Sequence, residues 1–141
     1  MESDDLKIET LPTSQDIQFL DDQINAFNVT QTGIQDGKLL AIFVRNEARE
    51  VIAGIYGWTW GGCCEIRYLW VHPDLRGRGY GGRLLMAAEH EALARGCMQV
   101  VLDTHSFQAP KFYAKLGYER ISILEDYPRG HQKIYLKKSL K

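Results

Sequence analysis

A glycine-dense stretch, residues 71–85, constrains this chain more than any other feature of the sequence. It follows an apolar run and leads into a helical pattern predicted for residues 81–95. Glycines let the backbone approach a ligand closely, and the first N–H groups of a helix attract anions. Arg76 and Arg78 add positive charge. The stretch therefore predicts a binding site for several phosphate oxygens, such as the pyrophosphate of a nucleotide-bearing cofactor.

One interpretation of this stretch is a dinucleotide-binding fingerprint. Gly77, Gly79 and Gly82 fit the pattern GxGxxG, and Asp103 follows Gly82 by 21 positions. Two features speak against it. Residues 72–76 separate the strand from the first glycine, and three strands are expected before the motif instead of after it. The alternative of an NAD-binding oxidoreductase fragment stays open at this point.

The second interpretation is that the stretch resembles the acyl-coenzyme A loop of the GNAT superfamily of N-acetyltransferases. The family signature, Arg/Gln-x-x-Gly-x-Gly/Ala, is matched by Arg76, Gly79 and Gly81. Downstream, residues 109–118 resemble the family segment Ala-x-x-Phe/Leu-Tyr-x-Lys-x-Gly-Phe/Tyr. The clear match covers residues 65–118 and departs from the family at Ser106, where members often have Asn. The chain is thus similar to small, single-domain members of bacterial type.

This resemblance implies acetyl-CoA as the cofactor and a set of residues that bind it. The pyrophosphate would lie on the glycine loop. The pantetheine arm would form backbone hydrogen bonds with the strand that precedes the loop, as an additional strand would. The implied binding residues are Leu69, Trp70, Val71, Arg76, Gly77, Arg78, Gly79, Tyr80, Gly81, Gly82, Ser106, Ala109, Phe112 and Tyr113.

The pattern of elements agrees with an α/β (α+β) chain of the GNAT fold. That fold has a mixed, mostly antiparallel sheet of six to seven strands, flanked by helices, with a V-shaped splay between strands 4 and 5. Turn residues and apolar periodicity predict three helices, at residues 15–28, 81–95 and 110–116. They predict strands at residues 6–10, 39–45, 51–60, 63–71, 98–102, 118–124 and 131–136. The family's second N-terminal helix would be reduced to part of residues 29–38.

Length and composition predict a single domain, residues 1–141, in the cytoplasm. No apolar run is long enough for a membrane span, and the acidic start lacks the basic and apolar regions of a signal peptide. The three cysteines have neither disulfide nor metal spacing, so no metal is expected. No basic run carries interleaved aromatics, which disfavours nucleic acid as a partner.

Charge divides unevenly along the chain. Residues 1–50 carry 10 acids and 4 bases, whereas residues 51–141 carry 8 acids and 13 bases. A basic second half suits a phosphate-rich cofactor, and an acidic first half is compatible with a cationic substrate or with solvated surface charge.

Acetyl transfer to an amine needs a neutral nucleophile and a proton for the departing thiolate. By resemblance, Tyr113 attends the thiolate. Glu65 is the predicted base, because it lies six positions before Val71, where lysine-acetylating members place a glutamate. Strand alternation is expected to put Glu65 on the face of Leu69 and Val71. An ion pair with Arg67 or simple solvation would equally explain this glutamate.

Other side chains are weaker candidates for the site. His105, Asp103 and His131 are expected near the same cleft, although each also fits a structural role. Tyr56, Trp58 and Trp60 share strand parity, which suits core packing, an acceptor pocket or the contact of a homodimer.

The sequence thus predicts an acetyl-CoA-dependent N-acetyltransferase that acts on a primary amine, with small molecules favoured, by direct attack in a ternary complex. The alternatives are a non-catalytic acyl-CoA sensor on the same fold, the NAD-binding fragment, and a structural interaction module.

Overall fold

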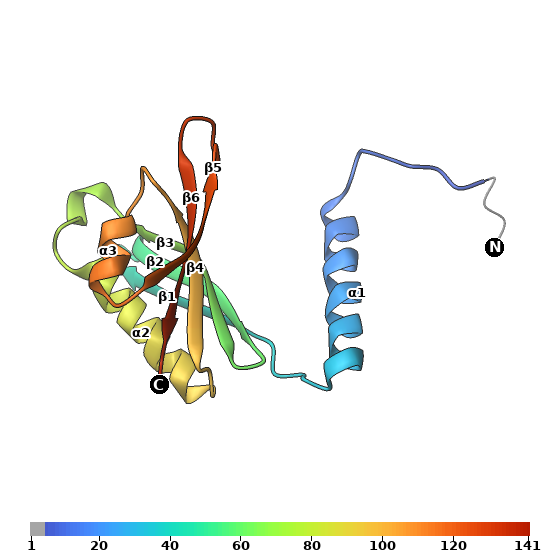
Figure 1. The fold of residues 1–141 in the computed structure, drawn as a ribbon, viewed down its shortest axis with the longest axis horizontal. Helices are drawn as coiled ribbons and strands as arrows, with labels where there is room; N and C mark the ends of the chain where they lie inside the picture. Colours follow the sequence, from blue (N-terminus) through green and yellow to red (C-terminus); the bar gives the residue numbers. More distant parts are fainter. Residues whose placement is uncertain (1–4) are drawn as a thin grey trace. The chain divides into compact units, whose positions relative to one another are not determined.

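The computed structural model describes residues 5–141 (Figure 1). By their internal contacts these residues divide into two compact units, one ending at Gln35 and the other spanning Asp36–Lys141. A single domain over residues 1–141 remains a prediction. The acidic start, residues 1–4, lies outside the described residues.

The first unit consists of an extended segment and one helix, α1 (Ser14–Thr32). Thr13 and Asp16 begin the helix as a reciprocal capping box, with hydrogen bonds of 3.1 and 3.0 Å. Gly33, at a φ of 73°, ends it. The helix was predicted to end at residue 28 but continues to Thr32, so it includes the first residues of the segment 29–38.

The strand predicted for residues 6–10 is wrong. These residues have no regular structure and pair with no strand of the described sheet. Alternation of apolar and polar residues over so few positions does not make a strand without a neighbour that completes its hydrogen bonds.

The second unit is a six-stranded mixed sheet with helices, which confirms the predicted GNAT-type fold. Its strands are β1 (Lys38–Arg45), β2 (Val51–Trp60), β3 (Cys63–Val71), β4 (Gln99–His105), β5 (Glu119–Glu125) and β6 (Gln132–Ser139). Its helices are the 3₁₀ turn η1 (Pro73–Leu75), α2 (Tyr80–Ala94) and α3 (Pro110–Lys115). The strand order is β1-β2-β3-β4-β6-β5, and β3 with β4 is the one parallel pair of this sheet.

Helix α2 packs against β1, β2 and β3, and its buried face supplies the centre of the core. The largest fully buried side chains are Leu40, Ile55, Leu85, Ile134, Leu136, Val100, Cys64 and Cys97. Three predicted glycine positions are confirmed by positive φ values. Gly61 and Gly62 connect β2 to β3, and Gly96 follows α2.

The parallel pair β3–β4 holds together along only part of its length. Cys63–Ile66 pairs with Gln99–Leu102, and beyond these residues the register ends. We call residues 63–66 with 99–102 the closed end, and residues 67–71 with 103–105 the open end. This divergence is the predicted splay. It was expected between strands 4 and 5 because residues 6–10 were counted as the first strand, and it lies between β3 and β4 in the structure.

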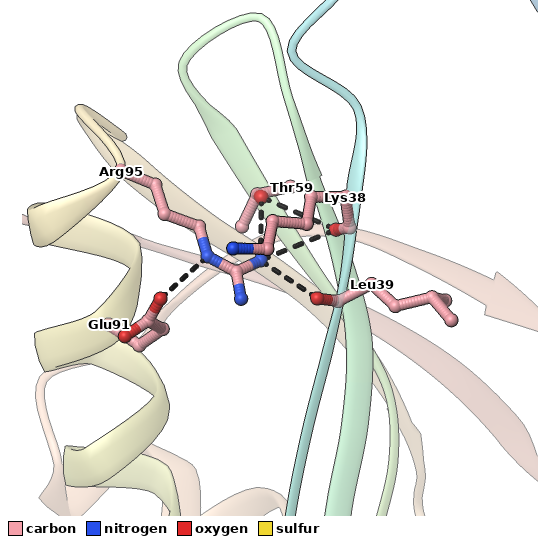
Figure 2. Close-up of polar contacts among 5 residues, drawn as sticks. All are labelled: Lys38, Leu39, Thr59, Glu91 and Arg95. Carbon is pink, nitrogen blue, oxygen red and sulfur yellow. Dashed lines mark hydrogen bonds and ion pairs between the residues drawn. The ribbon is translucent and has the colours of Figure 1, made fainter.

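Side-chain clamps fix the elements around the closed end. Arg95, just after α2, donates to the carbonyl of Leu39 at 3.0 Å and to Thr59 Oγ1 at 3.0 Å (Figure 2). Its Nε donates to Glu91 at 2.8 Å, which holds the guanidinium in place. The end of α2 is thereby tied to β1 and β2.

A second clamp is centred on Glu89 of α2. Its carboxylate accepts hydrogen bonds from Tyr118 Oη at 2.7 Å and from Lys138 Nζ at 3.0 Å. Because Glu89 is mostly buried, these two partners satisfy a charge that would otherwise be costly to desolvate.

Candidate active site

A cleft of about 790 Å³ lies where β3 and β4 diverge. It is lined by Ile66, Arg67, Tyr68, Leu69, Trp70, Arg76, Leu102, Asp103, Thr104, His105, Phe107, Gln108, Ala109 and Tyr113. Residues 68–71 pair with β2 on one edge but not with β4 on the other. Residues 68–70 also line the cleft, so an extended ligand there can pair with their remaining backbone N–H and C=O groups.

The glycine loop enters α2 with its amides available for an anion. Gly77 and Gly79 have φ values of 79° and 86°, and Gly79 caps α2 without a side-chain hydrogen bond. Within residues 5–141, no hydrogen-bond acceptor is found for the amides of residues 77–79, and the first-turn amides of a helix lack intrahelical partners. A Cβ at Gly77, Gly79 or Gly82 would meet no atom within 4 Å. The loop is an open cradle that fits a pyrophosphate.

Two further contacts shape the loop. The residues between strand and glycines form η1, capped by His72 Nδ1, which accepts from the Asp74 amide at 3.1 Å. A Cβ at Gly81 would lie 3.3 Å from the ring of Phe112. Glycine at this position therefore lets the start of α2 approach α3 closely.

Tyr113 on α3 lies in the wall of the cleft with its ring mostly buried at 8% exposure. The rings of Phe112 and Tyr118 contact it edge-on at centroid distances of 5.1 and 5.9 Å. Burial, with a smaller effect of the Asp103 carboxylate, raises the pKa of Tyr113 to about 12. The phenol is therefore neutral near pH 7 and able to donate its proton.

The structure brings some of the predicted site residues together. Leu69, Trp70, Arg76, Ala109 and Tyr113 all line the cleft. Their roles toward a cofactor remain predictions.

Nine of the fourteen predicted binding residues are not among the residues that line the cleft: the six loop residues 77–82, and three residues with other contacts, Val71, Phe112 and Ser106. Val71 offers its carbonyl to Arg76 Nε at 3.2 Å. Phe112 packs beneath Gly81, and Ser106 Oγ accepts from the amide of Gln132 at 3.0 Å.

The expectation that Glu65 shares a face with Leu69 and Val71 is wrong. A bulge shifts the register, so that Gly57 pairs with Ile66 whereas Tyr56 pairs with Tyr68. The extra residue reverses the alternation of side chains along β3. Glu65 lies in the paired part of β3, is exposed, and is not among the residues that line the cleft. Its catalytic role is untested.

Sequence reasoning missed seven residues of the cleft wall: Ile66, Arg67, Tyr68, Leu102, Thr104, Phe107 and Gln108. Arg67 and Tyr68 reach the cleft through the bulge, which left no signal in the sequence. Phe107 and Gln108 follow β4, and Gln108 Oε1 accepts from the His105 amide at 2.7 Å. Ser106, a polar residue directly after the end of β4, was the one sequence signal that favoured a turn here.

The sheet does not support a dinucleotide fold. Such folds are built on several parallel strands, whereas the described sheet has one parallel pair. Asp103 instead lies at the open end, 3.9 Å from Lys133 Nζ. None of the described helices combines the length and hydropathy that crossing a bilayer requires.

Comparison with known proteins places the chain in a family. The model of the acetyltransferase (GNAT) family matches residues 6–118. An acetyltransferase of Agrobacterium fabrum, Atu2258, is 33% identical over 117 residues, covering 83% of this chain and 85% of that protein. The blasticidin-S acetyltransferase of Streptomyces morookaense is 35% identical over 97 residues, covering 66% and 69%.

A solved structure agrees with these matches. The crystal structure of an acetyltransferase from Bacillus cereus superimposes with a TM-score of 0.79 at 30% identity, covering 94% of this chain and 97% of that one. The chain therefore belongs to the GNAT family of acetyltransferases, enzymes whose acyl donor is acetyl-CoA.

Proposed function

We propose that this enzyme transfers the acetyl group of acetyl-CoA to a primary amine of a small molecule, by direct attack in a ternary complex. One observation carries the proposal. The unpaired edge of β3, the anion-binding loop and a neutral tyrosine meet at the open end of one β3–β4 pair. These are the three elements that a thioester donor of extended shape requires.

In this proposal the glycine loop, residues 76–82, binds the pyrophosphate, with Arg76 and Arg78 supplying charge. The backbone of residues 69–71 pairs with the pantetheine amides. Ala109 and Phe112 border the arm on the side of α3. Ser106 can still donate its hydroxyl proton, because its contact with Gln132 uses only the oxygen as acceptor.

Tyr113 is proposed as the acid for the departing thiolate. A phenol that stays protonated near neutral pH carries the proton it must give, and burial holds its ring in one orientation. Acetyl-CoA supplies the activated acyl group, while the chain's own residues orient it and move protons.

A small-molecule acceptor is supported by similarity and by size. The relative from Streptomyces morookaense is named for the antibiotic it acetylates. The cleft, at about 790 Å³, lies in the range typical of small-molecule sites, and its aromatic walls suit an amine-bearing cation. A cytoplasmic location and a homodimer remain predictions from the sequence alone.

The direct test is release of free thiol from acetyl-CoA in the presence of single amines, with mass spectrometry of the product. Blasticidin S, kanamycin, spermidine and lysine cover four classes of acceptor. We expect stoichiometric thiol and a product heavier by one acetyl group with at least one of them. Tight acetyl-CoA binding without turnover on a widened amine panel would favour the sensor instead.

A further inference from the structure

We infer that His105, the last residue of β4, is the base that removes the proton from the acceptor amine. The inference rests on the proposed N-acetyltransferase function and names a catalytic residue for it. It replaces Glu65 in that role, because Glu65 is not among the residues that line the cleft, whereas His105 is.

One hydrogen bond fixes which nitrogen of His105 is basic. Its Nδ1 lies 3.0 Å from the backbone carbonyl oxygen of Tyr127. A carbonyl oxygen can only accept, so Nδ1 carries the hydrogen in the neutral ring. Nε2 is then left with a lone pair, on a ring that borders the cleft.

Two aromatic rings contact the His105 ring. Phe107 stacks on it at a centroid distance of 5.3 Å and an angle of 12°, and Tyr127 contacts it at 5.7 Å. The backbone of the same turn is fixed by Gln108, whose amide donates to the His105 carbonyl at 2.9 Å. A base held this way is pre-oriented for proton transfer.

The other titratable groups near the cleft are less suited to the role. Asp103 is an ion-pair partner of Lys133, whose Nζ lies 3.9 Å from the Asp103 carboxylate. His131 packs edge-on against Phe107 at 5.0 Å but is not among the residues that line the cleft.

His105 of β4 and Tyr113 of α3 line the same cleft. One can therefore accept a proton while the other donates one. His105 Nε2 takes one proton from the acceptor ammonium, which frees the nitrogen lone pair. A C–N bond forms at the thioester carbon as the C–S bond breaks, and Tyr113 gives its proton to the sulfur. The second proton of the nitrogen returns through solvent to the Tyr113 oxygen, and His105 releases its own to solvent.

The first test reads the tautomer and needs no turnover. Long-range ¹H–¹⁵N correlation spectra of the full chain, with His105 assigned by its loss in H105N, distinguish the two neutral forms. We expect Nδ1 protonated and Nε2 unprotonated. A ring that carries its hydrogen on Nε2 would overturn the inference.

The second test compares variants with the best amine of the panel. In H105N the amide nitrogen can keep the hydrogen bond to the Tyr127 carbonyl, but the side chain has no basic nitrogen. We expect kcat to fall roughly 100-fold with acetyl-CoA affinity unchanged, and added imidazole to restore part of the activity of H105A. H90A, which removes a histidine of α2 outside the cleft, is the matched control.

The pH profile of kcat/KM separates a base from a structural residue. An acidic limb is expected with the wild-type enzyme and should disappear in H105N. Other titratable or charged groups near the His105 ring can also influence this profile. They are Asp103, Lys133, Tyr127, His131 and Arg67. An H105N enzyme with full activity and an unchanged profile, or a loss of the limb in E65Q instead, would overturn the inference. Absence of turnover in the wild type would overturn the proposed function, and this inference with it.

Discussion

The two ends of the β3–β4 pair differ in how their polar groups are satisfied. At the closed end, residues 63–66 and 99–102 pair backbone to backbone, and the Arg95 and Glu89 clamps satisfy the polar groups around them. At the open end the same strands part, and the glycine loop exposes unpaired amides beside the gap. One pair of strands thus provides both rigid support and an unfilled hydrogen-bonding edge.

This difference indicates a division of labour along a single pair of strands. The backbone groups at the open end are unpaired, so they do not stabilise the folded state. They are instead available to form hydrogen bonds with a ligand. The closed end supplies the stability that holds those groups in position. Substitutions at the two ends should therefore separate: those at the open end change binding or turnover, and those at the closed end change the free energy of unfolding.

The largest effect is expected from Tyr113→Phe at the open end. Loss of the proton donor should lower kcat about 10³-fold, equivalent to about 4 kcal/mol in the barrier. The dissociation constant of acetyl-CoA and the unfolding midpoint should change little, because the ring stays. Thiol-release kinetics and calorimetry measure both. A variant with wild-type kcat would remove Tyr113 from the mechanism.

The second largest effect is expected from Gly57→Ala next to the closed end. Its Cβ would overlap the carbonyl oxygen of Glu65 and lie 3.0 Å from Ile66 Cα, both parts of the backbone that cannot rotate away. We expect a loss of about 3 kcal/mol in the free energy of unfolding, measured with urea.

Gly82→Ala is the matched glycine of the open end. A Cβ at Gly82 would meet open space, and the φ of this residue is not positive, so the free energy of unfolding should not fall. The affinity for acetyl-CoA should fall, because the added methyl group occupies the loop. Equal destabilisation by both alanines would contradict the division of labour.

Arg95→Met tests the clamp in Figure 2. Thr59 is 2% exposed and would lose the charged donor at 3.0 Å, together with the bonds to the start of β1. We expect a loss of about 2 kcal/mol in the free energy of unfolding, with acetyl-CoA affinity unchanged. Arg95→Lys should recover little of it, since an ammonium cannot reproduce the fork of bonds.

Stability should also fall at alkaline pH. Burial raises the pKa of Tyr113 to about 12, and burial with Glu89 raises that of Tyr118 above its usual value of 10.0. The folded state therefore keeps protons that the unfolded state releases above pH 10, and stability falls as pH rises from there towards 12. Each group contributes a slope of up to about 1.4 kcal/mol per pH unit.

Urea titrations from pH 8 to 11 measure this slope. It should be shallower in Tyr118→Phe than in the wild type, although this variant also loses the bond to Glu89 at every pH. Parallel curves for the two proteins would show that Tyr118 does not hold its proton in the folded state.

Local patterns predicted much of this molecule from the sequence. The glycine loop, the turn at Gly61 and Gly62 and the cap at Gly96 depend on backbone conformations that neighbouring residues determine. The bounds of β2 and β3 were predicted as observed, because turn signals flank both strands. The motif around Tyr113 likewise depends on residues close in sequence.

The features that could not be predicted depend on pairing between distant residues. The bulge that turns Glu65 away from the face of Leu69 depends on the register of β3 against β2. The hydrogen bond that orients His105 joins positions 22 residues apart. Periodicity within one strand contains neither piece of information, which is why Glu65 was expected to face the cleft and the orientation of His105 was not foreseen.

Isothermal titration tests whether acetyl-CoA binds at the open end. Acetyl-CoA and NAD are titrated separately into the wild type and into Gly79→Trp, which places a bulky side chain at the open cradle and at a positive φ. We expect acetyl-CoA to bind the wild type and not Gly79→Trp, with circular dichroism showing that both proteins are folded. Binding of NAD instead, or acetyl-CoA binding that survives the substitution, would contradict this expectation.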